Sequence, residues 1–261
     1  MKFSVCIDMM YPEADIAGRC EITKQVGAQA VEFWKWTNKD IPALAEKLRE
    51  LGIGAALMNL DSADEALSAA LMRGILSHRR IDDFIRAIHE TAPVMRQLGM
   101  ENCIVLAGDV DDEIPLEQAF ENIRDTLAAG AKAASDEGIN LLLEPLNTYD
   151  RPSYVLPWSA PSFDILRDVN SPNVKLLLDL YHTQRMEGNL IDTMMKNIDL
   201  IGHFHVAGSP WRCEPSLGEV DYMQVFDAIE AVGYEGYVGF EYRVRKTSFD
   251  LGEYIRKYRG R

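Results

Sequence analysis

The amino-acid sequence predicts one (β/α)8 barrel over residues 1–261, and three observations lead to that fold class. Eight short apolar runs alternate with longer segments of helical spacing along the chain. Apolar strands separated by helices are typical of parallel strands joined by right-handed crossovers, and eight such repeats indicate a closed barrel. The length of 261 residues is close to the roughly 250 that such a barrel uses as a single domain.

The eight expected strands are the short apolar runs. In order they are Phe3–Ile7, Ala30–Phe33, Gly54–Met58, Asn102–Leu106, Asn140–Glu144, Val174–Asp179, Ile201–Val206 and Tyr237–Glu241. An open doubly wound sheet is the alternative, but such a sheet usually has a glycine-rich phosphate-binding turn after its first strand. Here the first strand is followed by Asp8-Met9-Met10-Tyr11-Pro12, which favours the barrel.

The segments between the strands space their apolar residues as helices do. They include Ile41–Leu51, Ile81–Leu98, Pro115–Glu137, Ala160–Val169, Leu190–Asn197, Tyr222–Val232 and Phe249–Tyr258. Glycines at joins between a helix and the next strand are expected to cap the helix in the left-handed conformation; they are Gly27, Gly52, Gly99, Gly138 and Gly233. Two long connections, Asn59–Arg80 and Pro145–Ser159, follow strands, on the side where barrel enzymes build their sites.

Composition excludes several classes of protein. The formal net charge of −14 argues against a nucleic-acid surface, which needs clustered Lys and Arg. No pair among the four cysteines has the CxxC spacing of a zinc or redox motif, so we expect reduced thiols and a cytoplasmic location. Neither a secretory signal nor a membrane span is expected, since the sequence lacks a long apolar run.

Four successive late strands end in residue types that bind metal ions. Glu144, Asp179 and Glu241 each follow an apolar run, and His205 lies two residues after His203 in the seventh strand. Carboxylates that meet at one barrel mouth would repel one another without a cation between them. Oxygen ligands with one imidazole suit Mg²⁺ or Mn²⁺. A single such carboxylate could equally cap a helix or pair with an arginine, but four of these residues together favour a metal site.

Further polar residues in the neighbouring loops could hold a substrate. His182 follows Asp179 by three residues, and Asp150 lies in the loop after Glu144. Arg212 and Glu214 lie in the loop after His205. Arg212 could bind a carboxylate as a planar fork, or it could be an ordinary surface arginine.

Several segments together resemble hydroxypyruvate isomerases, which belong to the xylose-isomerase-like TIM-barrel superfamily. The segments are 143–152 (LEPLNTYDRP), 179–188 (DLYHTQRMEG), 202–207 (GHFHVA), 212–215 (RCEP), 218–222 (GEVDY) and 239–242 (GFEY). The resemblance covers most of the chain and is densest from residue 140 to 245. It implies a dimer or tetramer that acts on a small hydroxy-carbonyl substrate.

The resemblance also implies roles for individual residues. Glu144, Asp179, His205 and Glu241 would bind the metal, and the two glutamates would also be catalytic. His182 and Arg212 would bind the substrate. The implied reaction interconverts hydroxypyruvate and tartronate semialdehyde through an enediolate.

One residue departs from the pattern of hydroxypyruvate isomerases. These enzymes often carry Gln at the position of His205, where the related ketose 3-epimerases carry His. A ketose or ketonic-acid 3-epimerase is therefore the first alternative, and a dehydratase of the superfamily is another. A barrel that binds sugar acids without catalysis remains a different class, and a metal-dependent nuclease is disfavoured by the acidic charge.

Overall fold

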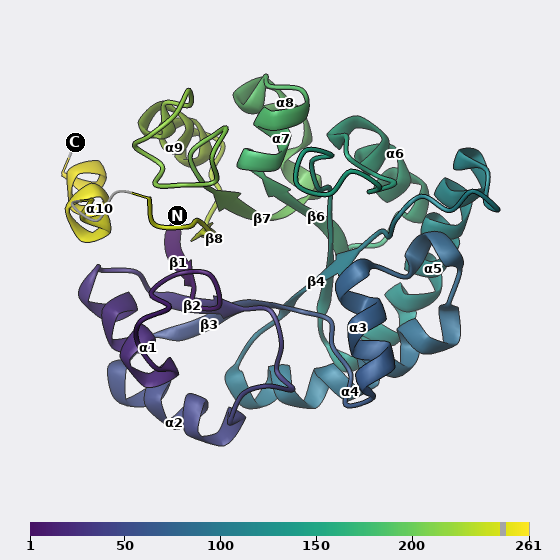
Figure 1. The fold of residues 1–261 in the computed structure, drawn as a ribbon, viewed down its shortest axis with the longest axis horizontal. Helices are drawn as coiled ribbons and strands as arrows, with labels where there is room; N and C mark the ends of the chain where they lie inside the picture. The colour runs from purple at the N-terminus through teal and green to yellow at the C-terminus, as the bar shows by residue number, and fades with distance from the viewer. Residues whose placement is uncertain (246–248, 261) are drawn as a thin grey trace.

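The computed structural model describes residues 1–245 and 249–260, and its strands form a closed parallel barrel (Figure 1). Neighbours in the chain are neighbours in the barrel, and β8 pairs with β1 to close it. The strands are β1 (Lys2–Cys6), β2 (Ala30–Phe33), β3 (Gly54–Asn59), β4 (Asn102–Leu106), β5 (Asn140–Glu144), β6 (Val174–Asp179), β7 (Ile201–Val206) and β8 (Tyr237–Phe240). The expected barrel is confirmed, and the open doubly wound sheet is wrong.

The helices lie outside the strands (Figure 1). They are α1 (Ile16–Gln25), α2 (Ile41–Leu51), α3 (Glu65–Arg73), α4 (Ile81–Leu98), α5 (Leu116–Glu137), α6 (Ser159–Val169), α7 (Leu180–Met186), α8 (Leu190–Asn197), α9 (Tyr222–Ala231) and α10 (Leu251–Arg259), with short 3-10 helices η1 (Leu76–His78) and η2 (Ile198–Leu200). Within the described residues, no helix is both long and apolar enough to cross a membrane.

Two features of the helices differ from the sequence expectation or refine it. The segment Asn59–Arg80, expected as a long connection, contains α3 and η1. Asp64 caps α3 by accepting a hydrogen bond from the Leu67 amide, a local arrangement that apolar periodicity does not reveal. The five glycines expected to cap helices all have positive φ, between 63° and 84°, which confirms the left-handed ends.

Side-chain alternation along the strands separates two apolar cores. One face of each strand packs against the helices, as Leu141 and Leu143 of β5 do. The other face fills the barrel, where Leu142 and Leu177 join a smaller cluster with residues of β2, β3 and β4. Because the side-chain period of a strand is two residues, the residue two positions after Leu142 or Leu177 also faces the barrel interior, at its C-terminal end.

Candidate active site

The four expected metal-type residues meet at the C-terminal end of the barrel. Glu144 and Asp179 lie two residues after the inward-facing Leu142 and Leu177. Asp179 is paired in register with His205 of β7, and Glu241 follows β8 directly. One ligand atom from each of the four lies within 4.8 Å of all the others, and all four side chains are buried. The strand period therefore brings these residues together.

Burial and mutual charge set the protonation of this cluster. Burial, together with the charges of Glu241 and Asp179 and against the opposing charge of His205, raises the pKa of Glu144 to about 8. Burial likewise raises the pKa of Asp179. Burial also acts on Glu241, but Arg212 and His205 outweigh it and hold its pKa well below the usual value. Three carboxylates this close are stable only with positive charge among them.

Arg212 supplies part of that positive charge. Its Nη2 lies 2.6 Å from Glu241 Oε2 and 3.5 Å from Asp179 Oδ2. Its guanidinium also lies over the Tyr181 ring, 5.3 Å from the ring centroid. In the part of the chain that the structure describes, Arg212 Nε has no hydrogen-bond partner. Arg212 is therefore a site residue rather than a surface arginine, with donor capacity left for a ligand.

His182 presents a neutral hydrogen-bond donor to the same cluster. Its Nδ1 accepts from the backbone N–H of Asn147 at 3.0 Å and lies 2.6 Å from Asn147 Nδ2. The amide orientation is set because Asn147 Oδ1 accepts the N–H groups of Tyr149 and Asp150. Burial holds the pKa of His182 well below its usual value. The remaining proton is thus on Nε2, 3.5 Å from Asp179 Oδ2.

The two other expected substrate residues are placed differently. Asp150 Oδ2 accepts hydrogen bonds from Tyr181 Oη at 2.7 Å and from Asn147 Nδ2 at 3.0 Å. Glu214 is fully buried in the loop after β7, where its Oε1 accepts the backbone N–H of Arg245 at 2.8 Å. The structure therefore brings Asp150 to the site, whereas Glu214 braces a loop.

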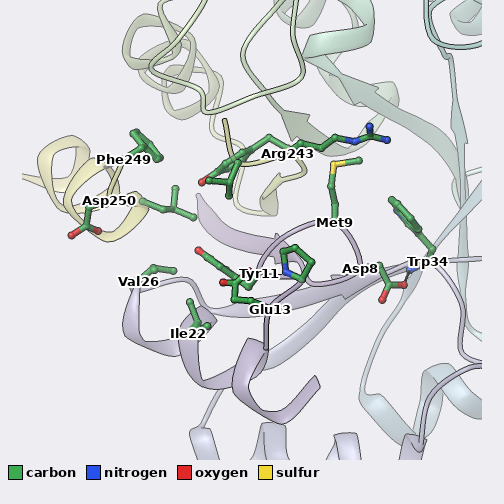
Figure 2. Close-up of a pocket in the computed structure, with 14 residues that line it drawn as sticks. Asp8, Met9, Tyr11, Glu13, Ile22, Val26, Trp34, Arg243, Phe249 and Asp250 are labelled. Carbon is green, nitrogen blue, oxygen red and sulfur yellow. Dashed lines mark hydrogen bonds between the residues drawn. The ribbon is translucent and has the colours of Figure 1, made fainter. Parts of the chain in front are cut away.

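A cavity of about 240 Å³ opens above the cluster. It is lined by Trp34, Asn59, Met72, Ile104, Leu106, Glu144, Leu146, Asp150, Arg151, His182, Arg212 and Glu241. A larger cavity of about 890 Å³ lies beside it, with Trp34 and Asp8 at one end and Phe249 and Asp250 at the other (Figure 2). Trp34 lines both cavities. The smaller cavity suits a substrate of a few carbon atoms.

Sequence reasoning missed three side chains that contact the cluster. Trp34 Nε1 donates to Glu241 Oε1 at 2.8 Å, and Cys6 Sγ lies 3.6 Å from the same oxygen. Glu32 Oε2 lies 2.9 Å from His205 Nε2. A lone glutamate inside the apolar strand Ala30–Phe33 is an available signal for Glu32, whereas nothing in the sequence marks Trp34 or Cys6.

The donor set fits a hard divalent cation. Glu144, Asp179 and Glu241 offer oxygen atoms and His205 offers a nitrogen atom, all converging on one region. Among the described residues, the inward His205 Nδ1 has no hydrogen-bond partner with good geometry, as a nitrogen aimed at a ligand position would. Carboxylate oxygens are the ligands that Mg²⁺ and Mn²⁺ prefer, and carboxylates together with an imidazole also bind Zn²⁺.

Comparisons with known proteins place this geometry in a family. The family model described as xylose isomerase-like TIM barrel matches residues 20–258. The chain is 33% identical over 249 residues to a hydroxypyruvate isomerase of Escherichia coli (strain K12), with 95% of each chain covered. It is 32% identical over 262 residues to a 2-oxo-tetronate isomerase of Cupriavidus necator, covering 100% of this chain and 99% of the other. A solved structure titled AP endonuclease, family 2, from Brucella melitensis has a TM-score of 0.87 at 26% identity, covering 100% and 99%.

Proposed function

The chain belongs to the xylose isomerase-like TIM-barrel family, and we propose that it is a metal-dependent isomerase that interconverts hydroxypyruvate and tartronate semialdehyde. Curated relatives that align over nearly the full chain support an isomerase. The observation that carries the proposal is the convergence of three carboxylates and one imidazole within 4.8 Å beneath a small cavity that also contains Arg212.

Glu144, Asp179, His205 and Glu241 would hold Mg²⁺ or Mn²⁺. When bound, the cation supplies polarisation of the substrate carbonyl and stabilisation of the negative charge on the enediolate. Asp179 and His205 act as ligands alone, because Asp179 Oδ1 already accepts the amides of Tyr181 and His182.

The two glutamates carry the proton transfer. Glu144 or Glu241 removes the proton from the carbon that bears the hydroxyl group, and the same or the opposite glutamate returns it to the neighbouring carbon. Both side chains line the cavity, so each can reach a bound substrate. A carboxylate must be ionised to accept a proton, and the low pKa of Glu241 keeps it ionised, although so acidic a group is also a weaker base.

His182, Arg212 and Asp150 would orient the substrate. The Nε2–H of His182 donates to a substrate oxygen, and Arg212 binds the substrate carboxylate with its guanidinium, whose Nε–H has no partner among the described residues. Asp150 fixes Tyr181, which lies under the Arg212 guanidinium. Glu214, expected at first to touch the substrate, is proposed instead to hold the Arg212 loop through Arg245.

A nuclease activity is not favoured, although one similar structure is titled an endonuclease. The formal net charge of −14 opposes the approach of a phosphate backbone, because such binding depends on neutralising lysines and arginines.

The proposal is tested with Glu241→Gln and purified substrates. The variant should bind Mn²⁺ but lose turnover of hydroxypyruvate, because an amide cannot accept the proton. Glu230→Gln is the matched control, since Glu230 is half exposed beside the N-terminus, and it should keep full activity. Near-normal turnover by Glu241→Gln would remove the catalytic assignment.

The alternative of a ketose or ketonic-acid 3-epimerase uses the same residues. It is tested by incubating the enzyme in deuterated water with hydroxypyruvate, 2-oxo-tetronate and a ketohexose in separate reactions. Deuterium at C3 of the ketohexose, without isomerisation of hydroxypyruvate, would replace the proposed reaction with epimerisation.

A further inference from the structure

Glu32 is a buried carboxylate in the middle of the barrel, below the proposed metal site. It lies on β2 and is 2% exposed. Ser4 Oγ of the neighbouring strand donates to its Oε1. His203 Nε2 lies 2.8 Å from Oε1, and His205 Nε2 lies 2.9 Å from Oε2. One carboxylate thus contacts both histidines of β7.

The contact between Glu32 and His205 determines which imidazole nitrogen faces the cluster. An ionised carboxylate can only accept hydrogen bonds, so the proton of His205 at this contact lies on Nε2. The opposite nitrogen, Nδ1, lies 3.2 Å from Glu241 Oε2 and 3.9 Å from Glu144 Oε1. When a cation occupies the cluster, the His205 imidazole would be neutral, with its lone pair on Nδ1 directed at the other three ligands.

We propose that Glu32 is the positioning residue of the site: it holds His205 in the Nε2–H tautomer and orients Nδ1 as a metal ligand. This inference rests on the proposed metal site. Partners that hold the second nitrogen of a ligating histidine both fix the ring and increase its basicity, and their loss typically lowers metal affinity about 10–100-fold.

The surrounding backbone is shaped to leave room for this carboxylate. A Cβ at Gly239 of β8 would lie 2.5 Å from Glu32 Oε2 and 2.6 Å from Oε1. Gly239 is paired in register with His205, so the glycine stands beside the contact that it permits. A carboxylate that served only to fill space would not need two histidines and a serine arranged around its oxygens.

The test compares Mn²⁺ affinity in Glu32→Gln, Glu32→Asp, Ser4→Ala and wild-type protein by calorimetry. Glu32→Gln removes the charge, and Glu32→Asp keeps the charge but shortens its reach to His205. Both should weaken Mn²⁺ binding about 10–100-fold. Ser4→Ala is the matched control, because it removes a neighbouring hydrogen bond to Glu32 and leaves the contact with His205, and its Kd should stay within about twofold of wild type.

A second readout follows the imidazole directly. The chain has five histidines, so long-range ¹H–¹⁵N spectra of cadmium-loaded protein can be assigned by single substitutions. Wild-type His205 should show a protonated Nε2 and a cadmium-bound Nδ1. In the Gln variant the Nε2 proton should be partly lost or the cadmium contact weakened, which a merely structural role for Glu32 would not produce.

The outcomes separate this inference from the proposed function. Wild-type protein that binds no Mn²⁺ would overturn both. If wild type binds Mn²⁺ and a folded Glu32→Gln or Glu32→Asp variant binds it equally well, the positioning role alone is wrong. Should neither variant fold, a wild-type His205 that coordinates cadmium through Nε2 would overturn the inference by itself.

Discussion

Replacing Gly239 with alanine should destabilise the barrel, because the added methyl group would clash with the Glu32 carboxylate. The added Cβ would lie 2.5–2.6 Å from both carboxylate oxygens, closer than real contacts allow. Overpacking of this kind costs about 1–3 kcal/mol. If the carboxylate moves, its hydrogen bond to His205 is lost as well, and a hydrogen bond to a charged group contributes about 1.5–3 kcal/mol. Alanine also restricts the unfolded chain more than glycine does, and this lower conformational entropy stabilises the folded state by about 0.4–1 kcal/mol.

These terms leave a net loss of about 2 kcal/mol or more for Gly239→Ala. At about 2–4 °C per kcal/mol for a chain of this size, its Tm should fall by about 4 °C or more in the metal-free protein. Gly54→Ala is the control, because the Cβ added on β3 would meet its first neighbour, Tyr237 Oη, at 3.7 Å, an ordinary contact. It should leave the Tm unchanged or slightly higher. Equal melting temperatures for the two variants, measured by calorimetry, would refute the reasoning.

Three further predictions concern the site itself. Trp34→Phe removes the hydrogen-bond donor to Glu241 Oε1 and should lower kcat/KM about tenfold. Trp36→Phe is the control, because the Trp36 indole donates to Thr91 instead, and it should leave kcat/KM unchanged. Equal kcat/KM values for the two variants would contradict the role of Trp34. The pKa of Glu144 is raised to about 8, so at pH 7 a cation must displace the proton of this carboxyl group. Metal affinity should therefore increase from pH 6 to pH 8, with release of a proton on binding. Calorimetry in two buffers measures both the affinity and the proton release, and an affinity that does not change with pH would count against the prediction. His182→Phe should raise KM for hydroxypyruvate more than His182→Gln, which keeps a donor, and equal values would show that the donor is not used.

The sequence predicts the barrel well because its pattern is repeated and local. The strands are short and apolar, and helical segments were expected after seven of the eight, so the signals agree along most of the chain. The same locality explains two of the four cluster residues, since an inward-facing leucine followed two positions later by Glu144 or Asp179 places the carboxylate inside the barrel. Helix α3 was missed because it is short and buries only Leu67, Ser68 and Leu71, so its apolar spacing is a weak signal.

What the sequence does not reveal depends on contacts between distant strands. Glu32 and His205 are 173 positions apart, and Trp34 and Glu241 are 207 apart; only barrel closure brings each pair together. Glu214 shows a contact within one loop region that the sequence also does not reveal. It lies two residues from Arg212 in a loop that resembles known substrate loops, yet its carboxylate accepts a backbone N–H. Position in a functional loop does not show which way a side chain points.

The buried charges of the barrel form two levels, and His205 links one level to the other. At the upper level, Glu144, Asp179 and Glu241 repel one another and need a cation or Arg212 among them. At the lower level, the Glu32 carboxylate is held at a pKa of about 2 despite its burial, because His203 and His205 lie against it. His205 belongs to both levels, so a change at Glu32 reaches the upper carboxylates through one ring. Metal affinity should therefore respond to substitutions in the barrel interior that touch neither the cation nor the substrate.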